Sequence, residues 1–164
     1  MAGDPIDVAI QQALTSRALA FVAAWNTANP VVPPNLLTIA QPNVAFTTPA
    51  AVTTKAGFPA VYGRWLQASV LPAPTFARGV DYDASNQHYG IFQLSVFMGA
   101  GSNELNVKRI AGAVAEYFKR GTVLRANGLP VTVYDTPVIA AGFKDDPWWV
   151  VPVSIPFKCF APSP

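Results

Sequence analysis

The chain is poor in the residue types that most often carry out chemistry in proteins. Its 164 residues include one histidine, one cysteine and only 12% charged residues. A single cysteine excludes an internal disulfide and fits a reducing compartment. His88 has neither a second histidine nor a neighbouring cysteine as a co-ligand, which argues against a metal centre and a Cys–His nucleophile pair. The composition therefore predicts no catalytic, metal-binding or cofactor-binding residues, and no enzyme.

The low charge also limits the partners of the molecule. The net charge is +2, and the sequence has no basic run and no aromatic residues interleaved with arginines. Recognition of nucleic acid therefore has no electrostatic basis here. A surface with so few charges is tolerated more easily when copies of the same chain cover part of it, so the composition favours an oligomer.

The first residues do not resemble a secretory signal or a membrane span. Acidic Asp4 and Asp7 stand where a signal peptide has basic residues, and the helix predicted after them contains Gln11, Gln12 and Arg17. We therefore expect a soluble protein that is made in a cytoplasm and has no membrane partner.

The remaining chemistry-bearing residues have simpler structural explanations. Cys159 alternates with apolar residues and is expected to be a small buried hydrophobe. The pairs Asp145-Asp146 and Asp81-x-Asp83 stand in turn-like stretches, where aspartate hydrogen-bonds its own backbone. Neither pair has the spacing of a calcium loop. None of these residues predicts a binding site.

Two further motifs lack what their chemistry requires. Gly99-Ala100-Gly101 follows a predicted strand and precedes a predicted helix, but it lacks the third glycine and the Gly-Lys-Ser/Thr of nucleotide-binding turns. Trp148-Trp149 suggests a sugar-stacking platform, yet adjacent strand residues point to opposite faces. We expect one tryptophan in the core and the other exposed or at an interface.

The clearest local pattern is a strand, a glycine turn and a helix in the middle of the chain. Residues 89–98 are rich in β-branched and aromatic types, and every even position from Phe92 to Met98 is apolar. A helix with Ser102 or Asn103 as its cap follows. Its apolar stripe, at helical spacing, consists of Val107, Ile110, Ala111, Val114, Tyr117 and Phe118.

An amino-terminal helix and a proline-rich arm precede this centre. Asp4-Pro5 favours a helix start, with Asp4 as the cap, and we expect the helix to end near Asn26. Arg17 intrudes on the apolar face and is expected to extend to its rim. Residues 27–42 contain four prolines and predict a connecting arm without helix or strand.

Shorter elements fill the rest of the chain. The sequence predicts strands at 44–48, 60–71 and 75–80, loops at 49–59 and 81–88, and a hairpin whose strands 122–125 and 129–134 flank an Asn-Gly turn. It shows no internal repeat and no boundary, so we expect one domain over residues 1–164.

The last predicted strand, residues 148–160, carries information about its neighbours. Its odd positions from Trp149 to Cys159 form a continuous apolar face. Pro152 and Pro156 share the other parity, so their missing N–H groups lie along one side of the strand. A central strand bonded on that side would lose two ladder bonds. We therefore expect that side to be an edge or a bulged pairing.

The order of these motifs resembles the tail-terminator family of long-tailed bacteriophages. The resemblance is strongest from about residue 43 to residue 160 and consists of core and turn residues. It runs through Asn43-Val44-Ala45-Phe46, Pro59-Ala60-Val61-Tyr62, Leu71-Pro72-Ala73-Pro74, Tyr89-Gly90-Ile91-Phe92-Gln93-Leu94-Ser95-Val96, Gly99-Ala100-Gly101, Tyr117-Phe118 and Trp148-Trp149-Val150-Val151-Pro152-Val153-Ser154-Ile155.

The resemblance implies an α+β fold, described equally as an α/β sandwich: a mixed, mostly antiparallel sheet with the amino-terminal and central helices packed on one face. It implies a structural protein of the virion neck, assembled in the host cytoplasm, with no catalytic residue to carry over. Such proteins form a ring, usually of six copies, on the end of the tail tube. The ring stops tube polymerisation, presents a docking surface to the head-completion or stopper protein, and lets DNA pass.

Five residues are candidates for contacts in such an assembly. A strand edge with Pro152 and Pro156 can adjoin another subunit without continuing a sheet indefinitely. Arg78, Asp81 and Asp83 belong to a polar loop that orders when it meets the tube, or else are simply solvated charges. The alternative functions are another neck or tail component, such as a head-completion or tail-tube protein, and a small-ligand binding module. A small enzyme ranks last.

Overall fold

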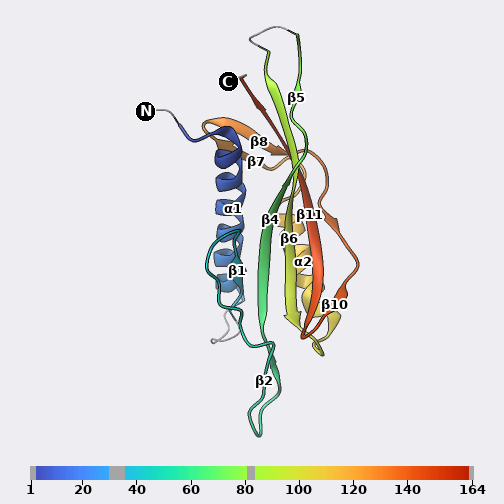
Figure 1. The fold of residues 1–164 in the computed structure, drawn as a ribbon. Helices are drawn as coiled ribbons and strands as arrows, with labels where there is room; N and C mark the ends of the chain where they lie inside the picture. Colours follow the sequence, from blue (N-terminus) through green and yellow to red (C-terminus); the bar gives the residue numbers. More distant parts are fainter. Residues whose placement is uncertain (1–2, 30–35, 81–83, 163–164) are drawn as a thin grey trace.

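The computed structural model describes residues 3–29, 36–80 and 84–162. These residues form an α+β fold in which two helices pack on one face of a mixed, mostly antiparallel sheet (Figure 1). The helices are α1 (Ile6–Ala28) and α2 (Glu104–Tyr117). The fold expected from the resemblance is therefore confirmed.

Long strands form the centre of the molecule, and hairpins extend from both of its ends (Figure 1). The main sheet consists of β1 (Thr38–Ala40), β4 (Arg64–Pro72), β5 (Phe76–Ala77), β6 (Asn86–Gly99), β7 (Val123–Ala126), β8 (Leu129–Val133), β9 (Val138–Ile139), β10 (Phe143–Asp145) and β11 (Trp148–Ala161). Its order is β1-β4-β6-β11-β8-β7, with β5 beside β6, and with β9 and β10 beside β11. A separate two-stranded hairpin joins β2 (Val52–Thr53) to β3 (Val61–Tyr62).

The antiparallel pair β6–β11 organises the core, as the alternation of apolar residues predicts. The two strands pair from Trp148 opposite Gly99 to Ala161 opposite Asn86. Because strand residues alternate between faces, every second side chain points toward the helices. The buried residues that these two strands give to the main core are Phe92, Leu94, Val96, Met98, Val151, Val153, Ile155, Phe157 and Cys159.

The central helix and the hairpin after it form where the sequence predicts them. The Asn103 side chain caps α2 by accepting a hydrogen bond from the Leu105 backbone N–H at 3.0 Å. The buried stripe of α2 and the residue after it consists of Val107, Ile110, Ala111, Val114 and Phe118. Between β7 and β8, Asn127 and Gly128 have φ values of 51° and 78°. Both left-handed residues are what a two-residue hairpin turn of this type requires.

Both ends of α1 differ from the prediction. Pro5 occupies the cap position without a side-chain cap, so the expected capping role of Asp4 is wrong. The carboxylate of Asp4 instead accepts a hydrogen bond from the Gln12 side chain at 3.2 Å. The helix ends at Ala28, two residues later than expected, because the Asn29 N–H still bonds to the Trp25 carbonyl at 2.8 Å.

Several short elements also differ from the prediction. No strand forms at 44–48, where Val44 N–H closes a turn on the Gln41 carbonyl. The predicted arm contains β1, and the predicted loop 49–59 contains β2. Strand β6 starts at Asn86, inside the predicted loop 81–88, of which residues 81–83 lie outside the described part of the chain. Each of these short strands depends on a distant partner, which local composition does not reveal.

Of the two alternatives expected for the proline side of β11, the free edge is wrong, and an irregular pairing forms instead. That side of β11 faces three short strands in turn: β10 at residues 148–150, β9 at 153–154 and β8 at 157–159. The gaps between these pairings fall at Pro152 and Pro156. The missing N–H groups are therefore accommodated by dividing the neighbouring strand into pieces, and the side carries no free edge.

Candidate assembly interface

The sheet has an outer face that neither helix covers. Cross-strand partners in an antiparallel pair point to the same face. The strand register therefore shows which residues lie side by side on the outer face. Three successive rows across β4, β6 and β11 are Gln67-Ser95-Pro152, Ser69-Gln93-Ser154 and Leu71-Ile91-Pro156. We call these nine residues the neutral sheet face. None of them is charged, and Leu71 and Ile91 are 51% and 40% exposed. Pro152 and Pro156 thus both belong to this surface.

Aromatic rings and one cation border the neutral sheet face where β11 ends. Lys158 lies opposite Tyr89 in the next row, with its ammonium 5.7 Å from the Tyr134 ring and 5.8 Å from the Phe160 ring. The Tyr89 ring also makes an edge contact with Tyr134. Within the described residues Lys158 has no carboxylate partner. The cation is therefore available to a carboxylate from another molecule.

The other end of the neutral sheet face is closed by aromatic packing. The Trp65 ring stacks on Phe97 at 4.0 Å and meets the edge of Trp148 at 6.0 Å. Phe46, from the segment after β1, covers Trp65 at 5.2 Å. Trp148 and Trp149 do point to opposite faces, but Trp149 is packed against the main core and neither is freely exposed.

The β5–β6 hairpin extends the sheet beyond the helices at the end where both termini lie (Figure 1). Its residue Arg78 is exposed, and its guanidinium lies 4.7 Å from the Phe160 ring on β11. Asp81 and Asp83, the other two residues predicted for tube contact, lie outside the described part of the chain. The hairpin therefore projects a cation and the exposed ring of Phe76 away from the core.

A second projection, the β2–β3 hairpin, leaves the opposite end of the molecule (Figure 1). Gly63 and Gly99 hold its base. A Cβ at either position would overlap the carbonyl oxygen of Ala50 or Ala51. The tip carries an exposed phenylalanine, Phe58, beside Lys55, and the sequence patterns gave no indication of it.

Helix α1 has an outer side that is almost free of charge. Asp7 and Arg17 are the only charged residues between Ile6 and Ala28. A groove of about 450 Å³ runs along this side, between α1 and residues 41–44. We call its α1 residues the neutral helix face: Val8, Gln11, Gln12, Thr15, Ser16 and Leu19. Val8 and Leu19 are each 43% exposed.

Arg17 is turned away from that side and joins the two helices. Its guanidinium donates a hydrogen bond to the Tyr117 carbonyl at 2.8 Å and lies 4.2 Å from the Tyr117 ring. The carbonyl belongs to the last turn of α2, where the helix dipole favours a cation. The sequence predicts that Arg17 extends to the rim of the packing surface, and there it contacts Tyr117 of α2.

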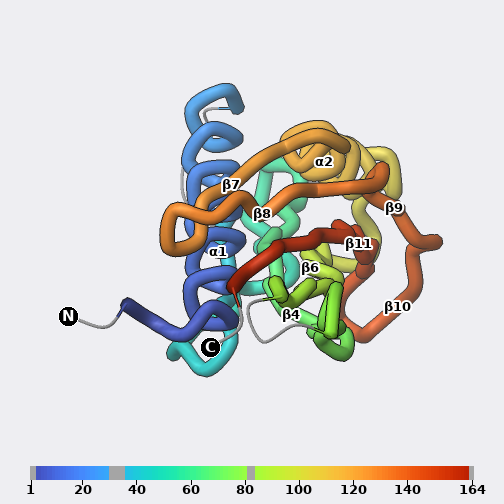
Figure 2. The backbone as a smooth tube through the Cα atoms, turned by 90° about the horizontal axis from the view of Figure 1, so that it is seen from above, coloured from blue at the N-terminus to red at the C-terminus, as the bar shows by residue number. Residues whose placement is uncertain are grey.

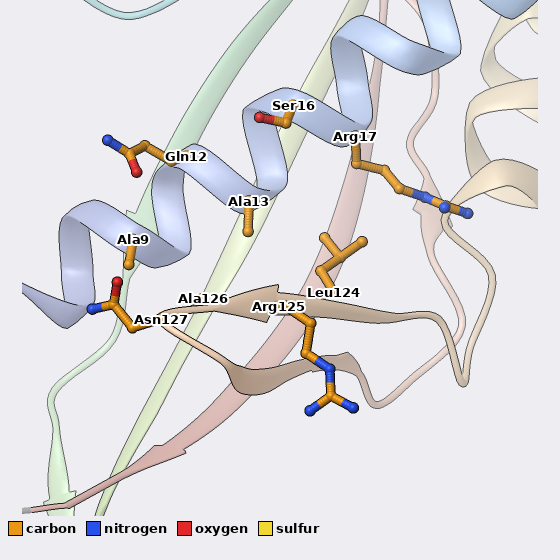
Figure 3. A pocket seen from close by; sticks show the side chains of 9 residues that line it. All are labelled: Ala9, Gln12, Ala13, Ser16, Arg17, Leu124, Arg125, Ala126 and Asn127. Carbon is orange, nitrogen blue, oxygen red and sulfur yellow. The ribbon is translucent and has the colours of Figure 1, made fainter. Parts of the chain in front are cut away.

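The groove between α1 and β7, of about 480 Å³, has no converging polar groups (Figure 3). Figure 3 shows the Arg17 side chain extending along the helix toward α2 and the Arg125 side chain pointing away from α1. Binding of a small polar ligand needs several groups aimed at one point. This arrangement of the groove does not provide them.

The surroundings of His88 and Cys159 indicate a structural role for both residues. His88 lies on the core side of β6, and its Nδ1 is 3.3 Å from the Asp7 carboxylate at the start of α1. The predicted loop position of His88 is therefore wrong. Cys159 is fully buried, as expected, and burial raises the pKa of its thiol. Among the described residues, no three histidine, cysteine or acidic side chains are grouped as metal ligands.

Comparison with known families decides the identity of the fold. A family model described as "Phage tail terminator protein" matches residues 9–157. The chain belongs to this family. Members of the phage tail terminator family are structural proteins of the virion tail rather than enzymes. None of the described helices is sufficiently long and apolar to cross a bilayer.

A solved structure has a similar fold. It is 27% identical in sequence, covers 96% of this chain and 96% of its own, and superimposes with a TM-score of 0.67. No curated protein sequence matches the chain.

Proposed function

We propose that this terminator-family chain assembles as a ring of six copies on the end of the phage tail tube. The ring stops tube polymerisation and presents the docking surface to the head-completion or stopper protein of the neck. It assembles in the host cytoplasm and leaves a channel for DNA. The observation that carries this proposal is the family match over residues 9–157.

The surface of the molecule supports assembly over chemistry. The neutral sheet face and the neutral helix face together leave few charges on two sides of the molecule, which favours coverage by other protein. The two projecting hairpins lie at opposite ends (Figure 1), so one can meet the tube while the other meets the neck. We assign Arg78, together with Asp81 and Asp83 that follow it in the sequence, to the tube contact, and Pro152 and Pro156 to the contact between copies.

A phage that lacks the gene tests the function. We expect tails of uncontrolled length that fail to join filled heads, and we expect the wild-type gene supplied in trans to restore uniform tails. Electron microscopy of lysates measures both. Loss of a tail-tube protein gives no tails, and loss of a head-completion protein gives tails of normal length without heads. Either of those results would reject a terminator role.

Replacement of three charges tests the tube contact separately. We expect the triple variant Arg78→Ala, Asp81→Ala, Asp83→Ala to form rings but to bind isolated tubes less tightly in a sedimentation assay. Normal seating of the triple variant on tubes would dismiss this assignment and leave the capping function in place.

A further inference from the structure

We propose that the ring contact joins the neutral sheet face of one copy to the neutral helix face of the next copy. We further propose that Lys158 of one copy and Asp7 of the next form an ion pair across this contact. The inference rests on the proposed ring and specifies its self-contact.

The chemistry of the two faces is matched. Nine residues of the sheet face and six of the helix face carry no charge. Each face also offers two exposed aliphatic side chains, Leu71 and Ile91 on the sheet and Val8 and Leu19 on the helix. A sparsely charged surface is tolerated more easily when another molecule covers part of it. Of the described residues, the segment 41–44 borders this side of α1, and Val8 and Leu19 stay exposed.

Two different faces favour a ring over a two-fold dimer. Helix α1 packs on the core side of the sheet, while the neutral sheet face is the other side (Figure 2). A two-fold contact pairs a face with the same face of a second copy, so it covers only one of the two faces. A head-to-tail contact covers both faces, and it closes into a ring when the rotation between copies permits.

One charge beside each face, Lys158 on the sheet and Asp7 on the helix, lies at nearly the same level along the strands. Asp7 contacts His88, which is the register partner of Cys159. Lys158, the adjacent residue, points to the opposite face, so the two levels differ by one residue, or about 3.3 Å along the strand. A rotation axis parallel to the strands preserves this level from copy to copy. It therefore brings Lys158 to the height of the next Asp7.

Both charges are available for this pairing. The Asp7 side chain is 83% exposed, although it also contacts His88. The Lys158 ammonium lies near the rings of Tyr134 and Phe160, and within the described residues it forms no ion pair. Opposite charge at matching height is the complementarity that selects a second copy as the occupant of the neutral sheet face.

Charge reversal tests the ion pair in the full chain. We expect Lys158→Glu or Asp7→Lys to lower the association constant between copies about fivefold, as for a partly exposed ion pair, in analytical ultracentrifugation. The double variant with both reversals restores association, because every contact then holds a reversed pair. Matched controls are Lys144→Glu and Glu104→Lys, the latter with the same unfavourable lysine at a helix start. Equal weakening by the controls, or no rescue in the double variant, would overturn the pairing.

Thiol crosslinking tests the two faces directly. The native Cys159 is fully buried, so the engineered thiols Val8→Cys and Ile91→Cys supply the reactive sites. We expect a short bismaleimide to join the two single variants when they are mixed, and to give much less product from either variant alone. The same reaction on isolated tails tests the contact in the case that the ring forms only on the tube. Absence of the mixed product in both settings would reject the faces, while intact capping of tails would leave the terminator function standing.

Discussion

The two faces of strand β6 carry different information, although they belong to the same fourteen residues. On the core face, Phe92, Leu94 and Val96 are fully buried under the helices. On the outer face, Ile91, Gln93 and Ser95 alternate with them; Ile91 is exposed, and Gln93 and Ser95 are only partly buried. The Gln93 side chain donates a hydrogen bond to the Ser95 hydroxyl at 3.2 Å, so even the polar residues of this face satisfy one another.

The difference separates folding from assembly. Residues of the core face determine whether the chain folds, because their burial supplies the hydrophobic stabilisation. The exposed or half-buried outer residues Ile91, Gln93 and Ser95 contribute little to that stabilisation and are free to be selected for contact with another molecule. Substitutions on the core face should therefore change the stability of the monomer, whereas substitutions on the outer face should change association.

The largest expected effect is the removal of a core side chain. We expect Leu94→Ala to lower the free energy of unfolding by about 2–5 kcal/mol, because it leaves a cavity beneath the helices. The neighbouring Gln93→Ala is the matched control and should change the same quantity by less than about 0.5 kcal/mol. Urea unfolding followed by circular dichroism measures both. Similar losses for the two variants would contradict the division between the faces.

A smaller effect is expected where the core face must remain without a side chain. Gly90 lies on β6, and a Cβ there would meet the Phe157 ring at 2.6 Å and the Leu71 carbonyl oxygen at 2.8 Å. We expect Gly90→Ala to cost about 1–3 kcal/mol of unfolding free energy through overpacking. Gly112→Ala in α2 meets no atom within 4 Å and should stabilise the helix by about 0.5–1 kcal/mol. Thermal unfolding of the two variants should shift in opposite directions.

Local patterns were sufficient for the elements that carry their own signals. The alternation from Phe92 to Met98, the cap at Asn103 and the turn at Asn127-Gly128 each depend on residues close in sequence, and all three are confirmed. Short strands gave no such signal. Strand β1 exists because Ile39 pairs with Leu66, which lies far along the chain.

The candidate interface was harder to predict from sequence than the core. The prolines at 152 and 156 correctly indicated an irregular side of β11, but the residues that fill that side come from three separate strands. The neutral sheet face depends on the register of β4 against β6, which no local pattern encodes. Asp7 and Lys158 lie at one level only because His88 extends β6 beyond the predicted strand.

The contact between the helices offers a prediction of intermediate size. Arg17→Met keeps the aliphatic length but removes the hydrogen bond to the Tyr117 carbonyl and the contact with its ring. We expect a loss of about 1–2 kcal/mol in unfolding free energy. Arg109→Met is the control, because the Arg109 side chain donates its hydrogen bond to the exposed Asn106 side chain of its own helix. If both variants lose the same stability, Arg17 adds nothing beyond an ordinary surface arginine.

The smallest expected effect is a loss of stability at alkaline pH that originates in Cys159. Burial raises the pKa of this thiol in the folded chain, whereas the thiol of the unfolded chain keeps its ordinary pKa. Below the ordinary pKa both states are protonated, and the thiol has no influence on the balance. As the pH rises through the ordinary value toward the raised one, only the unfolded state releases its proton, so the free energy of unfolding falls. The difference in urea-unfolding free energy between pH 7 and pH 10 should therefore be smaller in Cys159→Val than in the wild type. The outer-face variant Ser154→Ala should retain the full wild-type dependence, because the effect belongs to the core face of β11.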